Sequence, residues 1–239
     1  MNHHSNSSLA IIPARSGSKS IKNKNIKLFN GKPLIAWTIE LALESNFDRV
    51  IVTTDSDKIA DIAIKYGAEV PFLRGENLAS DNIAIEPVMI DVLDYLKKSE
   101  GYCPYCVGLL LPTSPFRVIS DINDAIKIYN MKKPTSVVSV SPATAGNNPY
   151  WMLKKNELGK ATMINGDDLS KFPSRRQDLP KCFIKNDFIF AINPENLYSK
   201  VPNLYGDRVE LLVIPEERLE VDINNNKDWM IAEQLFQFI

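Results

Sequence analysis

A cluster of basic residues follows the first apolar segment of the chain. Residues 15 to 25 read RSGSKSIKNKN and place Arg15, Lys19 and Lys24 among serines and one glycine. Cations beside a backbone of small residues offer what a phosphate group needs, namely positive charge and accessible N–H groups. The segment matches neither GxGxxG nor GxxxxGK(S/T), the common nucleotide-binding patterns. These residues predict a site for a small anion, with a solvated basic loop as the alternative.

A segment rich in acids and amides lies near the C-terminus. Glu220, Asp222 and Asn224 occupy alternate positions there. In an extended backbone, alternate side chains point to the same face. Carboxylate and amide oxygens are ligands that Mg2+ accepts, usually together with substrate phosphates. The segment therefore predicts a magnesium site, and a strand edge with solvated acids is the alternative.

Two of the three cysteines form a CPYC spacing, at Cys103 and Cys106. The spacing is typical of redox pairs, but here it precedes the apolar run VGLLL instead of opening a helix. No second pair and no nearby histidine completes a zinc site in the sequence. Reduced cysteines in a cytoplasmic protein are the favoured interpretation.

The composition is that of an ordinary globular protein. The 239 residues are 44% hydrophobic and 24% charged, and the formal net charge is −1. A nearly neutral chain generates no broad field for nucleic acid or an anionic membrane surface. No apolar run reaches the length of a membrane span. Residues 1 to 8 lack the order of a signal peptide and are expected to be disordered. We therefore expect a cytoplasmic protein that binds neither nucleic acid nor membrane.

Apolar strands alternate with amphipathic helices along much of the chain. Strands are expected at Leu9–Ala14, Arg49–Thr54, Glu69–Leu73, Val107–Leu111, Ser136–Val140, Phe188–Ile192 and Leu211–Ile214. Helices are expected at Pro33–Asn46, Asp57–Tyr66, Ile85–Lys98, Ser120–Met131 and Asp228–Phe238. This order predicts an α/β fold, with a mainly parallel, Rossmann-like sheet that helices cover on both faces. Ligands of such sheets bind at the carboxyl ends of the strands.

The alternation fails after Ser141, where the sequence becomes polar and rich in Asn, Gly, Asp and Pro. This stretch is too long for a plain loop in a compact domain. Residues 9 to 239 are therefore expected to form a single domain, with residues 141 to 205 as an inserted lobe.

Segments spread over nearly the whole chain resemble one enzyme family. They read IIPARSGSK with KNKN and NGKPLIAWTI, VIVTTDSDKIADIAIKYGAEVPFLRGENLASD, LLLPTSPFR, RRQDLPKCFIKND and EVDINNNKDWMIAE. In this order they resemble the CMP-sialic acid synthetase (acylneuraminate cytidylyltransferase) family, which includes the CMP-legionaminic and CMP-pseudaminic acid synthetases.

The resemblance implies a nucleotidyltransferase. Members of the family transfer CMP from CTP to the anomeric hydroxyl of a nine-carbon 2-keto sugar acid and release pyrophosphate, assisted by a divalent cation, normally Mg2+. Such chemistry depends on positioning and charge neutralisation more than on a protein nucleophile. The resemblance also implies a homodimer, in which the inserted lobe forms the dimer contact and contributes groups to the partner's sugar pocket.

Positions that match the family's motifs receive its roles by resemblance. Arg15 and Lys24 are expected to be catalytic, gripping the triphosphate and stabilising the pyrophosphate that leaves. The CTP site is expected to comprise Arg15, Lys19, Lys24, Asn25, Arg74, Ser80 and Asp81. The sugar site is expected to comprise Leu111, Thr113, Ser114, Arg176, Lys185 and Asn186, where a guanidinium suits the substrate carboxylate. Asp222, Asn224 and Glu220 are expected to hold the metal.

Each of these roles has a structural alternative. Asp81 could cap the helix that follows it. The PTSP segment could act only as a rigid turn. Arg176 could be plain surface charge.

Two positions depart from the family. Leu111 stands where many relatives carry a glutamine that contacts the sugar, which favours a nonulosonic acid other than N-acetylneuraminate. Asn224 stands where the family usually has a second aspartate, so either Asn224 or Glu220 completes the metal site. A sugar-acid cytidylyltransferase of the eight-carbon KDO type, or an inert homologue that binds nucleotide or sugar, is the alternative function.

Overall fold

The computed structural model describes residues 5–238, which divide into two compact units. The first unit comprises the chain up to Ser139, residues Asp187–Leu212 and the segment from Leu219 onward. The second comprises Val140–Asn186 and Val213–Arg218.

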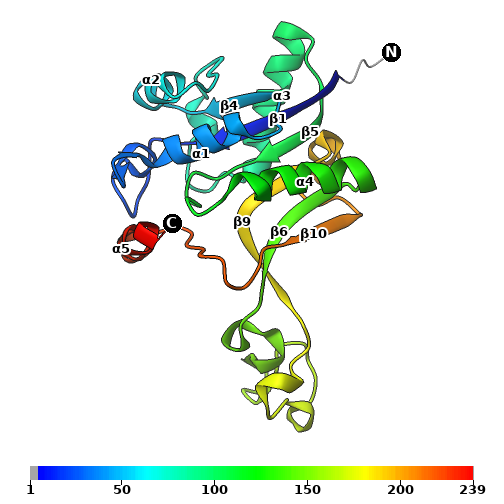
Figure 1. The fold of residues 1–239 in the computed structure, drawn as a ribbon. Helices are drawn as coiled ribbons and strands as arrows, with labels where there is room; N and C mark the ends of the chain where they lie inside the picture. The colour runs from blue at the N-terminus through cyan, green and yellow to red at the C-terminus, as the bar shows by residue number, and fades with distance from the viewer. Residues whose placement is uncertain (1–4, 239) are drawn as a thin grey trace. The chain divides into compact units, whose positions relative to one another are not determined.

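A six-stranded sheet organises the first unit, in the order β10-β6-β9-β5-β1-β4. Its strands are β1 (Ser5–Pro13), β4 (Arg49–Thr53), β5 (Pro104–Leu109), β6 (Ser136–Pro142), β9 (Phe183–Ile192) and β10 (Val209–Val213). The helices are α1 (Leu34–Glu44), α2 (Asp57–Lys65), α3 (Ile85–Glu100), α4 (Ile119–Lys132) and α5 (Asn226–Leu235), and a small hairpin joins β2 (Leu28–Phe29) to β3 (Lys32–Pro33). Strands β4 and β5 both pair in parallel with β1, whereas β9 pairs antiparallel with β5. The expected α/β fold with a mostly parallel sheet is confirmed (Figure 1).

Both faces of the sheet are buried, as a parallel sheet requires. On one face, Ile12 of β1 belongs to a core cluster with Ile39 of α1, Ile59 of α2 and Ile126 of α4. Its neighbour Ile11 is also fully buried and points to the opposite face, where α3 lies behind the sheet in Figure 1. Helices therefore cover both faces, and the carboxyl ends of β1, β4 and β5 meet at one edge.

The first strand begins at Ser5, four residues before the expected Leu9, so residues 5 to 8 are part of the sheet instead of disordered. Residues 1 to 4 lie outside the described residues. The carboxylate of Asp48 accepts hydrogen bonds from the N–H of Ser8 at 2.7 Å and from its hydroxyl at 2.9 Å. The segment is polar and carries no apolar pattern that would predict a strand. A remote residue, Asp48, stabilises it in the sheet instead.

The expected strand Glu69–Leu73 forms only isolated bridges to the edge of the sheet, from Glu69 to Ile51 and from Leu73 to Thr54. Pro71 lies between the two bridges. A proline has no N–H to donate to the ladder, so the pairing is interrupted there.

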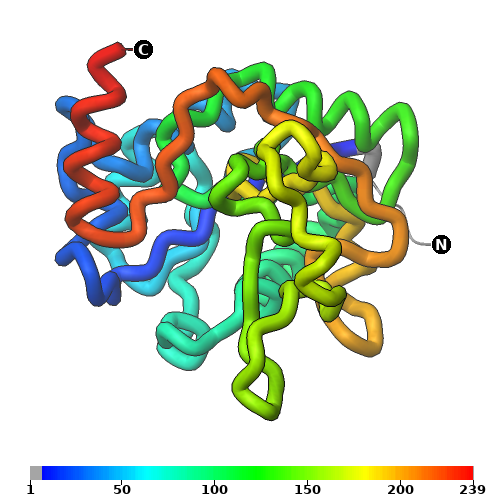
Figure 2. Tube along the Cα trace, turned by 90° about the horizontal axis from the view of Figure 1, so that it is seen from below, coloured from blue at the N-terminus to red at the C-terminus, as the bar shows by residue number. Residues whose placement is uncertain are grey.

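Aromatic side chains anchor the C-terminal helix α5 on the N-terminal part of the first unit. Phe29 of the β2–β3 hairpin makes edge contacts with Trp229 and Phe236, with ring centroids 5.5 and 5.1 Å apart. Phe236 also contacts Trp37 of α1 at 4.5 Å. Such pairs contribute roughly 0.5–1.5 kcal/mol each beyond their buried area. Figure 2 shows the result, with the C-terminal segment in red beside the N-terminal segment in blue.

The second unit contains one small hairpin, formed by β7 (Leu153–Lys155) and β8 (Ala161–Met163), and several short turns. The large hydrophobic side chains that it leaves exposed are Met152, Leu153, Leu158, Ile164, Leu169, Phe183, Ile184 and Val213. Val140, Met163 and Ile214 are its only buried large hydrophobic residues. The unit therefore has almost no apolar core of its own.

The second unit ends at Asn186, whereas the expected lobe extends to residue 205. The chain rejoins the first unit because β9 pairs with β5, for example through Ile192 and Val107. Residues 187 to 205 thus belong to the unit that carries the sheet.

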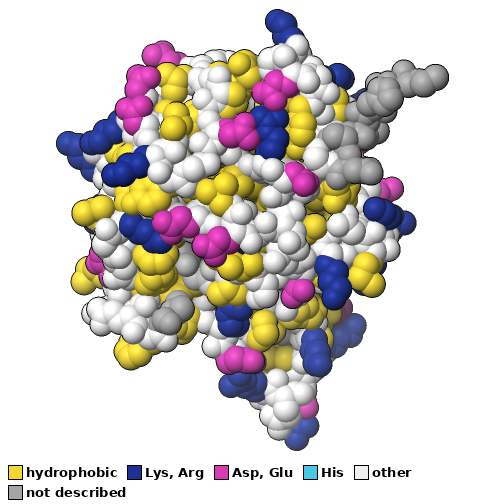
Figure 3. Space-filling view, turned by 45° about the horizontal axis from the view of Figure 1, so that its top comes forward, with side chains coloured by type: hydrophobic (Ala, Val, Ile, Leu, Met, Phe, Trp, Pro, Cys, Tyr) yellow, Lys and Arg dark blue, Asp and Glu magenta, His cyan; other side chains and the backbone are white. Residues whose placement is uncertain are grey.

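No helix between residues 5 and 238 is long and apolar enough to cross a bilayer. On the face drawn in Figure 3, basic and acidic side chains are interspersed. This distribution agrees with the formal net charge of −1.

Candidate functional site

A cleft of about 250 Å3 opens in the first unit, where β1 and β5 end. Eight of the residues predicted for a site line it: Arg15, Lys24, Asn25, Arg74, Ser80, Asp81, Leu111 and Thr113. These residues come from separate segments of the chain, and the sheet brings them to its carboxyl edge. This is the edge at which α/β proteins bind their ligands.

The basic loop after β1 is fixed by short-range contacts. Asn23 adopts a left-handed conformation with φ of 55° and starts a single 3-10 turn, Lys24–Ile26. The Asn25 amide donates a hydrogen bond of 3.0 Å to the carbonyl of Arg15, which ties the end of the loop to its beginning. Asn25 is buried and lines the cleft, but its N–H2 group is used within the loop. Its amide oxygen is the part that can accept a bond from a ligand.

Asp55, at the end of β4, holds the same loop from the other side. Its carboxylate accepts hydrogen bonds from the N–H of Ser16 at 2.8 Å and from the Ser16 hydroxyl at 2.5 Å. Burial is the largest single influence on the pKa of Asp55 and would raise it, but the bonds from Ser16, a bond from its own backbone and the charge of Arg74 together lower it. The carboxylate therefore stays charged at neutral pH. By holding Ser16, it fixes the backbone next to Arg15. Sequence analysis did not identify Asp55, because nothing local marks it as the partner of Ser16.

Asp81 pairs with two of the predicted cations. It forms ion pairs with Arg15 and with Lys19, the latter at 2.6 Å. The hydrogen bond from Lys19, followed by the one from Arg15, lowers the pKa of the Asp81 carboxyl. Helix α3 begins at Ile85, and Asp81 does not cap it. Asp81 thus serves as the counter-ion that gathers the basic loop, and an anionic ligand would compete with it for both cations.

Arg74 is almost fully buried in the cleft wall, with a side chain only 3% exposed. Its Nη2 lies 3.9 Å from the carboxylate of Asp55, and its buried Nε has no hydrogen-bond partner. Burial lowers the pKa of Arg74 because it penalises the charged form. A buried, charged donor without a partner is costly, so a ligand that accepts a bond from Nε would relieve this cost.

Lys24 joins the basic loop to the C-terminal segment. Its Nζ donates a hydrogen bond of 2.8 Å to the carbonyl of Ile223, which is 199 residues away in the sequence. Asp222 and Asp228 lie close enough to raise the pKa of Lys24, but burial is the larger effect and lowers it, assisted by Arg15. The ammonium group is therefore held between the cleft and the acidic segment.

The lowered pKa of Lys24 predicts how activity depends on pH. As pH rises, Lys24 loses its proton before an exposed lysine would, because its pKa lies below 10.5. The loss of positive charge weakens the grip on an anionic substrate, so kcat/KM should fall on the alkaline side, in a range below that of ordinary lysine. In Lys24→Arg this alkaline limb should move to higher pH, since arginine stays charged. If kcat/KM falls over the same alkaline pH range in the variant as in the wild type, the titrating group is not Lys24.

The acidic segment places an unsatisfied oxygen beside Lys24. The Asn224 amide donates to Oδ2 of Asp222 at 2.7 Å, whereas the buried Oδ1 of Asp222 has no hydrogen-bond partner. Asp228 fixes the backbone here, because its carboxylate accepts bonds from the N–H groups of Asn224 at 2.9 Å and Asn225 at 3.1 Å. Glu220 lies on the same segment and is exposed. No group of three or more His, Cys, Asp or Glu side chains that could hold a metal ion occurs between residues 5 and 238.

The PTSP turn is tied to both neighbouring segments. The carbonyl of Thr113 accepts a hydrogen bond of 2.9 Å from the N–H of Ile223. The Ser114 hydroxyl donates to the carbonyl of Asp187 at 3.4 Å, and this side chain is buried outside the cleft lining. Leu111 and Thr113 line the cleft, so the turn is rigid and also forms part of the wall.

The remaining predicted residues, Arg176, Lys185 and Asn186, lie in the second unit. Arg176 is exposed, lines a cavity of about 480 Å3 and approaches Glu216 at 3.9 Å. The buried Asn186 donates to the hydroxyl of Ser141 at 2.8 Å. Lys185 is exposed, one position before Asn186 on β9.

The cleft also contains an apolar wall that sequence analysis did not identify. Leu78, Ile83, Ile85 and Val88 line it, together with Ala84. Ile85 and Val88 belong to the first turn of α3, and helical periodicity alone assigns such residues to the core. One side of the cleft thus suits a flat, uncharged group and the other an anion.

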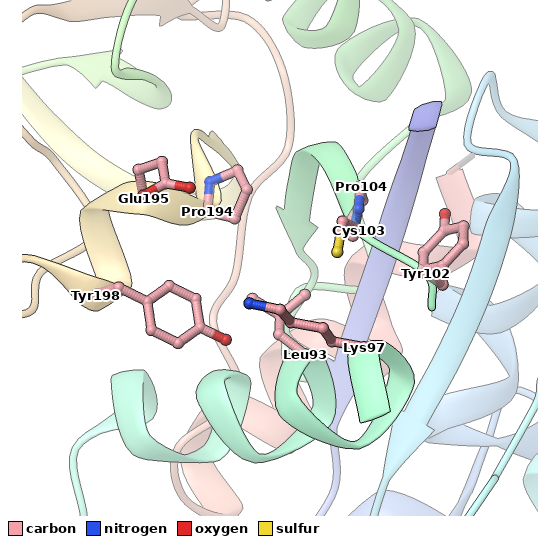
Figure 4. A pocket seen from close by; sticks show the side chains of 8 residues that line it. All are labelled: Leu93, Lys97, Tyr102, Cys103, Pro104, Pro194, Glu195 and Tyr198. Carbon is pink, nitrogen blue, oxygen red and sulfur yellow. The ribbon is translucent and has the colours of Figure 1, made fainter. Parts of the chain in front are cut away.

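A second cavity of the first unit, about 320 Å3 in volume, lies at the amino end of β5. Figure 4 shows Lys97 of α3, Cys103 before β5 and Tyr198 after β9 around it. Its only cation is Lys97. The cavity shares no lining residue with the cleft, and it lacks the clustered positive charge of the basic loop.

The two cysteines of the CPYC segment have different surroundings and do not form a disulfide. Cys106 lies inside β5 and is fully buried, and burial raises the pKa of its thiol. Cys103 lines the second cavity and is partly exposed. Residues three apart in an extended chain are separated by about 10 Å between Cα atoms, beyond the limit of roughly 7 Å for a disulfide.

Thiol labelling of the native protein tests this arrangement. Cys103 and Cys182, which are both partly exposed, should react with a small thiol reagent. Cys106 should react only after unfolding, since its thiol is buried and seldom ionised. Mass spectrometry of the labelled peptides would identify the sites, and native labelling of Cys106 would contradict the buried position.

Comparisons with known proteins agree with this geometry. The family model described as Cytidylyltransferase matches residues 9–210. The chain is 34% identical over 236 residues to the CMP-N,N'-diacetyllegionaminic acid synthase of Legionella pneumophila, with 96% of each chain covered. It is 36% identical over 226 residues to the N-acylneuraminate cytidylyltransferase of Escherichia coli, covering 94% of this chain and 51% of that protein.

Solved structures that share the fold include a nucleotide complex. It is that of CMP:2-keto-3-deoxy-manno-octonic acid synthetase complexed with CTP. The TM-score is 0.71 at 15% sequence identity, and the match covers 97% of this chain and 99% of that one.

Proposed function

The chain belongs to the cytidylyltransferase family, and on that premise we propose that it transfers CMP from CTP to a nine-carbon 2-keto sugar acid of the nonulosonic class. Family membership confirms the resemblance seen in the sequence and makes the chain a nucleotidyltransferase. The sugar acid as acceptor is supported by relatives that span nearly the full chain and carry such names.

One observation carries the proposal. Arg15, Lys24 and Arg74 come from three separate segments and line a single cleft of about 250 Å3. Within it, Asp81 pairs with Arg15, whereas Nε of Arg74 has no partner. A site with this excess of positive charge fits a triphosphate, and its apolar wall fits the base.

The chemistry requires attack by the anomeric hydroxyl oxygen of the sugar acid on the α-phosphorus of CTP. The new P–O bond forms as the bond to the bridging oxygen breaks, and pyrophosphate leaves. Arg15 and Lys24 would hold the phosphate oxygens and stabilise the charge that develops on the leaving group. Arg74 and the apolar wall would hold the nucleoside part, which keeps the reacting atoms aligned.

A divalent cation, Mg2+ in particular, fits this site as a companion of the triphosphate. Asp222 would hold it through the buried Oδ1 that lacks a partner, with Asn224 or Glu220 completing the set. A single carboxylate with substrate phosphates is a common arrangement for Mg2+. When bound, the ion would neutralise part of the phosphate charge.

Release of pyrophosphate from CTP tests the proposed function. The assay would use N-acetylneuraminate, a legionaminic-type acid, a pseudaminic-type acid and the eight-carbon KDO, each with and without Mg2+. Release with a nine-carbon acid is the expected result, and Leu111 in the cleft wall favours one other than N-acetylneuraminate. Release with KDO alone would move the enzyme to the eight-carbon class. CTP binding without release for any acid would support an inert homologue.

We also propose that the enzyme works as a homodimer through its second unit. That unit exposes Leu153, Leu158 and Phe183 and buries little apolar surface of its own. Exposed apolar surface of this extent is typical of an interface. Light scattering should give a mass of about twice 26.9 kDa, and a mass equal to one chain at assay concentration would contradict the dimer.

A cytoplasmic location is part of the same proposal. None of the cysteines Cys103, Cys106 and Cys182 forms a disulfide, as is usual for proteins of a reducing compartment. Fractionation of cells that express the protein with its own N-terminus would test it, with recovery in the cytoplasmic fraction as the expected result.

A further inference from the structure

Arg117 is buried behind the PTSP turn, and no predicted role includes it. It is 4% exposed and follows the turn by two residues. All three nitrogen atoms of its guanidinium group make hydrogen bonds. Nε donates to the carbonyl of Phe188, and Nη1 donates to the Thr38 hydroxyl at 3.4 Å. Nη2 donates to the carbonyls of Leu111 at 3.0 Å and Asp187 at 3.4 Å.

The acceptors of Arg117 are unusual for a buried cation. Arginine is seldom fully buried without a carboxylate partner. The hydrogen bonds of Arg117 end on carbonyls and a hydroxyl, while the nearby carboxylates of Asp121 and Asp187 favour its charged form electrostatically. Burial lowers the pKa of Arg117 to about 10, so the side chain still carries its charge at neutral pH. Burying this charge is costly, and three of its four hydrogen-bond acceptors belong to just two backbone segments.

One of those two segments borders the candidate site, and the other has a strained backbone. Leu111 begins the turn that lines the cleft. Asp187 directly follows Asn186 in the chain and has a left-handed backbone with φ of 59°. A residue other than glycine adopts that conformation at a cost, which the surrounding structure must offset. Bonds from Arg117 and Ser114 to the Asp187 carbonyl provide that support.

We propose that Arg117 is a positioning residue for the sugar acid. Its rigid, charged guanidinium group fixes the backbone at both Leu111 and Asp187. The proposal rests on the proposed function, because the sugar acid is its ligand. Arg117 does not touch the substrate. It acts through Leu111 and Thr113, which line the cleft, and through Asp187, whose carbonyl it holds.

Lysine cannot replace the guanidinium group of Arg117. A guanidinium presents its donors in one plane and reaches all of these carbonyls, whereas a single ammonium group does not. In Arg117→Lys the KM for the sugar acid should rise about tenfold or more, since misplaced positioning groups carry effects of that order. The KM for CTP should rise by a clearly smaller factor, because Arg15, Lys24 and Arg74 lie on other segments, although the same cleft includes Leu111 and Thr113. A merely structural role would instead lower the amount of folded enzyme and leave both KM values unchanged.

The matched control is Arg49→Lys. Arg49 also bonds through several nitrogen atoms, to Glu69 and Glu100, but it lies at the start of β4, away from the carboxyl edge. This variant should lower thermal stability without raising the KM for the sugar acid. Ser114→Ala, which removes the other donor to the Asp187 carbonyl, should raise the same KM by a smaller factor.

Hydrogen exchange of the unliganded protein gives a readout that needs no activity. Backbone amides of residues 111 to 114 and 187 to 189 should exchange faster in Arg117→Lys than in the wild type. Their exchange rates in Arg49→Lys should equal those of the wild type. Faster exchange there with an unchanged KM for the sugar acid, or equal rises of both KM values, would overturn the proposal. Wild-type protein that releases no pyrophosphate with any acid would instead refute the proposed function.

Discussion

Lys24→Ala should lower kcat/KM for CTP by about two to three orders of magnitude, which is the usual effect of removing one group that stabilises developing charge. The ammonium group lies in the cleft wall and reaches the Ile223 carbonyl at 2.8 Å. Alanine removes the charge and the link to the acidic segment together. Steady-state rates of pyrophosphate release, measured over a range of CTP concentrations, give the value.

Lys22→Ala is the matched control for this variant. Lys22 belongs to the same loop and is exposed, and it does not line the cleft. The rate of this variant should stay within about twofold of the wild type, because an exposed charge is screened by solvent. Thermal unfolding of both variants would show that the fold persists. Wild-type kinetics in Lys24→Ala would remove Lys24 from the mechanism.

Asp222→Asn should raise the Mg2+ concentration needed for half-maximal rate by about tenfold or more, since a charged ligand to a hard cation is lost. The substitution keeps the size of the side chain, so the link from Lys24 to Ile223 and the cap at Asp228 should persist. A magnesium titration at saturating CTP and sugar acid provides the measurement.

Glu220→Gln tests whether Glu220 takes part in the metal site beside Asp222. Glu220 is exposed, whereas Oδ1 of Asp222 is buried without a partner. We therefore expect a smaller shift of the magnesium requirement in Glu220→Gln than in Asp222→Asn. The reverse order would place the metal on Glu220, and unchanged titrations in both variants would place it elsewhere.

The sheet and the basic loop could be predicted because their signals are local. Apolar runs marked β1, β4 and β5, and the cations follow β1 directly in the sequence. Boundaries were less accurate where remote partners decide them. Ser5 to Ser8 joins β1 although it is polar, and Pro71 interrupts an expected strand.

Contacts between distant segments could not be derived from spacing. The bond from Lys24 to Ile223 joins residues 199 positions apart. Only the resemblance to a family linked the basic loop to the acidic segment beforehand. Asp55 was not identified because its partner Ser16 lies in the loop after β1, whereas Asp55 follows β4. Arg117 escaped notice for a different reason, since arginine is normally read as surface charge.

The second unit is the part that sequence reasoning described least well. Its hydrophobic residues show no helical or strand period, because the unit buries almost none of them within itself. The expected lobe therefore had a recognisable beginning near Ser141, but its expected end at residue 205 lies beyond Asn186, where this stretch of the second unit ends.

A double-mutant cycle between Lys24 and Asp222 tests the central claim most directly, namely that the basic loop and the acidic segment act together on one triphosphate. It compares kcat/KM for CTP in Lys24→Ala, Asp222→Asn and the double variant at fixed Mg2+. Groups that act as a unit give strongly non-additive effects, so the double variant should lose little more activity than Lys24→Ala alone. Losses that simply multiply would show two independent sites and contradict the account.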